Sequence, residues 1–191
     1  MSGEMVEIRW HGRGGQGVKT AAMLLAEAAF EGGMNIQGFS DYGPERSGAP
    51  IQGFTRLSKS EISLHNFITS PDVVVVLDST LLGVVAVTDG LKPEGKVIVN
   101  TPKTAAEIAK VLKVDVKQVY TVDAKKISME TIGRDMPNAP MVGAVVKIVG
   151  MVELPWIYKT FQKKFGAKSQ KIVDANVAAI NRAHAEVRGA A

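Results

Sequence analysis

Cysteine is absent from the 191-residue sequence. The chain therefore forms no disulfide and offers no thiolate nucleophile, no cysteine-ligated zinc and no cysteine-held iron–sulfur cluster. The lack of cysteine is also consistent with an intracellular location. The three histidines, His11, His65 and His184, lack the spacing of metal ligands, so we expect no metal site.

Targeting and membrane signals are missing as well. The N-terminal residues have no basic segment followed by an apolar one, which argues against a signal peptide. No apolar run approaches the roughly 20 residues that span a bilayer. The net charge of +4 is spread along the chain, which favours a solvated surface over a nucleic-acid-binding one. We therefore expect a cytoplasmic protein that binds neither membrane nor nucleic acid.

Strand-like and helix-like segments alternate along the chain. The expected strands are the apolar segments 5–10, 73–77, 96–100 and 118–122. The expected helices are 18–30, 80–88, 103–113, 139–152, one opening at Pro155, and 169–188. This alternation predicts an α/β fold with a mostly parallel sheet flanked by helices.

One region breaks the alternation. Residues 51–57 and 61–64, joined by 58–60, predict a β-hairpin insertion. No internal repeat or linker-like composition interrupts the sequence, and its length suits one compact core. We expect residues 1–191 to form a single domain.

A glycine cluster joins the first expected strand to the first expected helix. The candidate ligand-binding residues of this loop are Gly12, Arg13, Gly14, Gly15, Gln16 and Gly17. Its glycines fit the spacing of a dinucleotide-binding loop and leave the first helical N–H groups available to a phosphate or carboxylate. The alternative is a tight turn whose glycines only allow close packing. Asp41 comes late for the acid that holds a ribose in a dinucleotide fold.

A second loop, residues 42–50, is dense in proline and glycine and carries an aromatic ring beside opposite charges. The candidate interface residues are Tyr42, Pro44, Glu45 and Arg46. A loop that proline and glycine hold rigid loses little entropy on binding, and Tyr and Arg are common interface anchors. The alternative is an ordinary surface connection between two strands.

Two further residues are candidate helix caps. Asp78 ends an expected strand at the carboxyl edge, where α/β sheets bind ligands, but it also precedes Ser79 and Thr80 as an N-cap would. Asn138 is placed to cap the helix that follows, with Pro140 in its first turn. We favour a capping role for both. No Ser/His/Asp arrangement or isolated carboxylate pair stands out, so we name no catalytic residue.

With these residues in view, the chain resembles the gamma subunit of the 2-oxoacid:ferredoxin oxidoreductases, of the pyruvate and 2-oxoisovalerate type. The matching segments are 12–18, 42–50, 54–56, 71–78 and 138–143. They follow the order of the family over about three quarters of the chain.

The resemblance implies a hetero-oligomeric enzyme of anaerobic metabolism that decarboxylates a 2-oxoacid, transfers the acyl group to coenzyme A and reduces ferredoxin. Thiamine diphosphate, Mg²⁺ and the iron–sulfur clusters are implied in the alpha, beta and delta partners, with none in this chain. The resemblance further implies that this chain packs against the catalytic subunits and contributes to the coenzyme A side of the site, while being inactive alone. A free-standing dinucleotide-dependent oxidoreductase and a non-catalytic anion-binding module are the alternatives from the residues themselves.

Overall fold

The computed structural model describes residues 5–40 and 48–190. Its centre is a six-stranded sheet in the order β2-β3-β1-β4-β5-β6. Four strands run parallel to one another: β1 (Met5–Arg13), β4 (Val73–Val76), β5 (Lys96–Asn100) and β6 (Val119–Val122). On the other side of β1, β3 (Pro50–Ser58) lies antiparallel between β1 and β2 (Asn35–Ser40). The predicted α/β fold with a mostly parallel sheet is confirmed.

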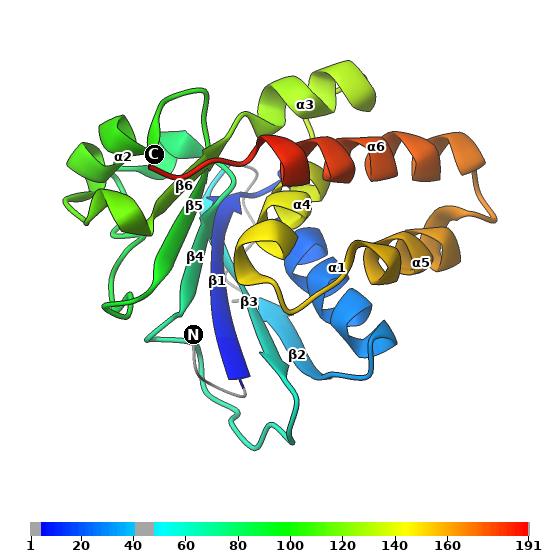
Figure 1. The fold of residues 1–191 in the computed structure, drawn as a ribbon, viewed down its shortest axis with the longest axis horizontal. Helices are drawn as coiled ribbons and strands as arrows, with labels where there is room; N and C mark the ends of the chain where they lie inside the picture. The colour runs from blue at the N-terminus through cyan, green and yellow to red at the C-terminus, as the bar shows by residue number, and fades with distance from the viewer. Residues whose placement is uncertain (1–4, 41–47, 191) are drawn as a thin grey trace.

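Helices cover the two faces of the sheet unequally (Figure 1). The thicker layer consists of α1 (Val18–Glu31), α4 (Asn138–Val149), α5 (Leu154–Phe165) and α6 (Gln170–Glu186). The opposite face, over β4 to β6, is covered by α2 (Ala105–Leu112) and by residues of η1 (Ser79–Leu81) and η2 (Val116–Gln118). Helix α3 (Ala124–Thr131) follows β6 and packs against α4 and α6. Two separate apolar clusters fill the two sides of the sheet.

Local sequence explains the closest packing. The four valines of β4 are fully buried, as expected for a parallel strand that is covered on both faces. Gly53 on β3 lets α1 approach, since a Cβ there would lie 3.2 Å from Cγ1 of Val18. The packing around Gly143 on α4 leaves even less space, because a Cβ there would lie 2.2 Å from the carbonyl oxygen of Ile180 on α6. The absence of a side chain at Gly143 therefore lets α4 and α6 pack closely.

Two expectations about local structure are wrong, and one helix was not predicted. Residues 61–64 form no strand, because both edges of β3 are already paired with β1 and β2, so the antiparallel pairing lies elsewhere than predicted. Residues 80–88 form only the short turn η1, and Gly83 then adopts a left-handed conformation (φ +85°) that ends the helical path. Helix α3 was not predicted, since its sequence AKKISMET has little apolar periodicity. The other predicted strands and helices lie close to the elements observed.

Among the described residues, no helix combines the length and apolar character that crossing a bilayer requires. After α6, the chain returns to the sheet, where Arg188 forms an antiparallel bridge with Thr121 on β6. This contact pairs part of the outer edge of β6.

Candidate functional site

The glycine loop connects the carboxyl end of β1 to the first turn of α1. Gly12 has no room for a side chain, because a Cβ there would lie 2.5 Å from Cγ2 of Val18. Gly15 and Gly17 adopt left-handed conformations (φ +96° and +78°) that favour glycine. Gln16 closes the turn by accepting a hydrogen bond from the backbone N–H of Arg13 at 2.7 Å. The glycines therefore serve both the tight turn and the close packing.

Asp78 draws the polar side chains of this loop toward the end of β4. Nε2 of Gln16 donates to Oδ2 of Asp78 at 2.7 Å, and Nε of Arg13 lies 3.2 Å from the same oxygen. Arg13 also donates to Oγ1 of Thr80 at 3.0 Å and to the carbonyl oxygen of Gly48 at 3.0 Å. The charge of Arg13 is therefore already balanced by a carboxylate within the chain.

Asp78 itself has two roles. Its Oδ1 accepts from the backbone N–H of Thr80 at 2.9 Å, so the predicted capping role is confirmed. Burial of this carboxyl opposes its ionisation, but hydrogen bonds from Thr80 and Gln16 and the charge of Arg13 together lower its pKa below the ordinary value. The carboxylate is therefore ionised at neutral pH, and it lies at the carboxyl edge of the sheet, as the sequence predicted.

A cleft of about 580 Å³ opens at this edge. Its walls come from the ends of β4, β5 and β6, from α3, from the glycine loop and from the segment before α4. The lining residues are Gln16, Leu77, Asp78, Ser79, Thr80, Asn100, Thr101, Pro102, Asp123, Lys125, Lys126, Met129, Asp135 and Pro137. Open α/β sheets commonly bind ligands in this position, beyond the carboxyl ends of their strands.

Two lysines of the cleft sit in the first turn of α3. Asn100 places them, since its Nδ2 donates to the carbonyl oxygen of Leu77 at 2.9 Å and its Oδ1 accepts from the backbone N–H of Lys125 at 3.2 Å. Asp123 caps the helix by accepting from the backbone N–H of Lys126 at 2.9 Å. The Nζ of Lys125 pairs with Asp135 at 3.2 Å. This wall of the cleft was not predicted from the sequence. The Lys-Lys pair directly after an expected parallel strand was the signal that could have found it.

The N-termini of α1 and α4 meet beside the glycine loop. Neither helix has a side-chain cap, and neither has an acidic residue in its first turn. Asn138 is the first residue of α4 instead of its cap, so that prediction is wrong. Its side chain packs against Gly17, where a Cβ would lie 2.8 Å from Nδ2 of Asn138. The buried Oδ1 of Asn138 has no hydrogen-bond partner among the described residues. Uncapped helix N-termini favour anions.

The histidines do not gather into a site. His11 is buried on β1, where its Nε2 accepts from Nε of Arg9 at 3.1 Å. Burial, and then the charge of Arg9, lower the pKa of His11 to about 4, so it is neutral at pH 7. Within residues 5–40 and 48–190, no three His, Asp or Glu side chains are grouped to hold a metal ion.

The candidate interface residues Tyr42, Pro44, Glu45 and Arg46 lie outside the described residues, so their role stays a prediction.

Comparisons with known proteins define the family. Residues 7–186 match the family model described as pyruvate ferredoxin/flavodoxin oxidoreductase. The common gamma subunit of the pyruvate/ketoisovalerate oxidoreductases from Pyrococcus abyssi is 47% identical over 87% of this chain and 92% of its own. The crystal structure of the pyruvate oxidoreductase subunit PORC from Thermotoga maritima superposes with a TM-score of 0.87 at 40% identity, over 99% of this chain and 100% of that one.

A third comparison shows the same fold inside a longer polypeptide. The 2-oxoglutarate:ferredoxin oxidoreductase from Magnetococcus marinus, solved with 2-oxoglutarate, coenzyme A and succinyl-CoA bound, gives a TM-score of 0.79 at 19% identity. The match covers 96% of this chain but only 31% of that one.

The chain belongs to the pyruvate ferredoxin/flavodoxin oxidoreductase family. It is a gamma-type subunit of a multi-subunit oxidoreductase that acts on 2-oxoacids, and the family resemblance stated from the sequence is confirmed.

Proposed function

We propose that this subunit binds the phosphate-bearing part of coenzyme A in the cleft at the carboxyl edge of its sheet. The observation that carries the proposal is one cleft of about 580 Å³ that is lined by Gln16 of the glycine loop, by Pro137 at the uncapped N-terminus of α4 and by the two lysines of α3. Coenzyme A has phosphates for the amide and ammonium donors, and hydroxyl and amino groups for the carboxylate of Asp123. The bound coenzyme A of the Magnetococcus enzyme supports this choice of ligand.

The reaction of the complex is then divided between chains. The alpha, beta and delta partners hold thiamine diphosphate, Mg²⁺ and the iron–sulfur clusters, and they oxidatively decarboxylate pyruvate or 2-oxoisovalerate in the cytoplasm. Two electrons leave through the clusters to ferredoxin, and the acyl group passes to the thiol of coenzyme A. The present chain holds the phosphate-bearing end of coenzyme A, so that the thiol at the other end reaches a partner subunit. It contributes binding and orientation, with no catalytic residue of its own.

The lysines of α3 provide the first test. The double variant Lys125→Ala/Lys126→Ala, measured in the assembled complex, should raise the KM for coenzyme A about tenfold or more, because a hydrogen bond to a charged group contributes about 1.5–3 kcal/mol. The KM for the 2-oxoacid should stay nearly constant.

A matched control removes two exposed lysines elsewhere. Lys168→Ala/Lys171→Ala makes the same change of charge in the connection between α5 and α6 and in the first turn of α6, and neither residue lines the cleft. It should leave both KM values unchanged. Equal effects of the two double variants would mean that overall charge, and not a site on α3, sets the affinity for coenzyme A.

A further inference from the structure

An aromatic patch lies on the face of the sheet opposite α1. It consists of the packed rings of Phe39 on β2, Phe54 on β3 and Phe67 from the segment 59–72, and Leu64 is a further exposed apolar residue of that segment. The ring centroids are 5.0 Å apart for Phe39 and Phe54 and 5.5 Å apart for Phe54 and Phe67. Phe54 is buried, but 54% of Phe67 and 41% of Leu64 remain exposed. The patch thus has a packed base and an apolar surface that faces outward.

The sequence around the patch is depleted in charge. Residues 62–71 contain no Asp, Glu, Lys or Arg, although such residues make up 22% of the chain. Most of these ten residues are exposed. Depletion of charge together with exposed aromatic rings distinguishes the centre of a protein–protein interface from the remaining protein surface.

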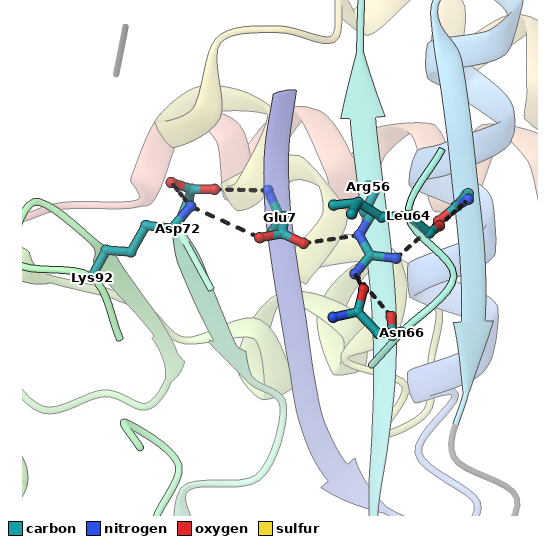
Figure 2. A network of polar contacts seen from close by, with 7 residues as sticks. Glu7, Arg56, Leu64, Asn66, Asp72 and Lys92 are labelled. Carbon is teal, nitrogen blue, oxygen red and sulfur yellow. Dashed lines mark hydrogen bonds and ion pairs between the residues drawn. The ribbon is translucent and has the colours of Figure 1, made fainter. Parts of the chain in front are cut away.

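A buried arginine fixes the patch on the sheet (Figure 2). Arg56 is 1% exposed, and its Nε donates to Oε1 of Glu7 at 2.8 Å. Its Nη1 donates to Oε1 of Gln37 at 2.9 Å, and its Nη2 donates to the carbonyl oxygen of Asn66 at 2.8 Å. Gln37 in turn donates to the carbonyl oxygen of Leu64 at 2.7 Å. Side chains of three strands therefore hold the backbone on both sides of His65.

The far end of the same segment is fixed as well. Oδ2 of Asp72 accepts from the backbone N–H of Glu7 at 2.9 Å, and its Oδ1 accepts from Nζ of Lys92 at 2.9 Å (Figure 2). Residues 59–72 include no helix or strand, yet they are held to the sheet at Leu64, Asn66 and Asp72. A surface that is rigid before binding loses little conformational entropy when a partner docks.

We propose that the aromatic patch docks another subunit of the same oxidoreductase complex, which presents an apolar, uncharged surface to Phe67 and Leu64. As a subunit, the chain must bind another polypeptide through at least one face. In the Magnetococcus enzyme the equivalent fold is 31% of a longer chain, so further parts of that polypeptide adjoin it. The pyruvate synthase subunit PorC of Thermotoga maritima is matched over 94% of its own length, so in that enzyme the fold forms a separate subunit whose neighbours are other chains. A second copy is disfavoured because each chain carries a net charge of +4.

The experiment measures assembly, so it does not depend on the coenzyme A cleft. Affinity-tagged variants are co-produced with the other subunits of the complex, and the recovered complex is quantified by native mass spectrometry and binding titration. Phe67→Glu should weaken assembly about thirtyfold or more, the range expected for an aromatic anchor of an interface. Ser63→Glu adds the same charge at an exposed position of the segment without disturbing the packed rings, and it should also weaken assembly.

Phe30→Glu is the matched control, since Phe30 is 67% exposed at the end of α1, on the other face of the sheet. It should assemble like the parent chain, and thermal unfolding of each free variant checks that the fold is retained. Normal assembly of both Phe67→Glu and Ser63→Glu would overturn the proposal, as would equal loss with Phe30→Glu. Loss of a homodimer in place of the complex would identify a second copy as the occupant and overturn it too.

Discussion

Arg13 and Asp78 should affect the use of coenzyme A in opposite directions if Arg13 contacts a phosphate. Arg13→Ala removes the guanidinium that contacts Asp78 and Thr80, two residues of the cleft, and one charge-assisted hydrogen bond is worth about 1.5–3 kcal/mol. The KM for coenzyme A in the assembled complex should therefore rise roughly tenfold to a hundredfold. Asp78→Asn removes the carboxylate that competes for Arg13 at 3.2 Å, so this KM should fall by up to about fivefold.

Loss of the Arg13–Asp78 ion pair should reduce the stability of the chain only slightly, and this loss can be measured separately from the KM. The Arg13 side chain is 31% exposed, and an ion pair of this kind contributes under about 1 kcal/mol to the free energy of unfolding. The assay is steady-state ferredoxin reduction with coenzyme A and the 2-oxoacid varied independently, beside thermal unfolding of each free variant. If both substitutions raise the KM for coenzyme A, the pair only shapes the glycine loop. If the KM for the 2-oxoacid changes equally, Arg13 acts in assembly.

Three further outcomes follow from the structure and the family. His11 has a pKa of about 4 when folded and about 6.5 when unfolded, so acid favours the unfolded chain. The free energy of unfolding should therefore fall by about 3 kcal/mol between pH 7 and 4, and His11→Gln should abolish that part of the slope in urea titrations. Gly143→Ala should destabilise the chain by about 3 kcal/mol, because its Cβ would collide with the backbone of Ile180, and thermal unfolding measures this loss. The isolated chain should reduce no dye with pyruvate, even with thiamine diphosphate and coenzyme A added, and turnover by the pure chain would refute its role as a subunit.

Local sequence was sufficient for the parts of the fold that depend on neighbouring residues. The four valines of β4 and the glycines after β1 predict a buried parallel strand and a tight strand-to-helix turn without any knowledge of the rest of the chain. The prediction of a strand at 61–64 was wrong because strand formation there depends on residues far away in the sequence. Its residues are compatible with a strand, but β3 has no free edge to offer it. Strand pairing is decided by the whole sheet.

For the candidate site as well, local features could be predicted from the sequence, but contacts between distant residues could not. The sequence located the glycine loop and the end of β4 as separate candidates, but it could not show that Arg13 and Gln16 turn to Asp78, which lies 62 positions beyond Gln16 in the sequence. That contact exists because β1 and β4 are neighbours in the sheet. Arg56 is a similar case. A charged residue in a strand suggests a solvated position, yet contacts to Glu7, Gln37 and Asn66 let it be buried.

Hydrogen exchange of the assembled complex tests the central claim most directly. Backbone amides are compared by mass spectrometry with and without saturating coenzyme A. Binding in the cleft should protect the glycine loop, the turn after β4 and the first turn of α3, while residues 59–72 exchange equally in both states. Protection confined to other subunits, with these three segments unchanged, would contradict the claim that this chain holds coenzyme A.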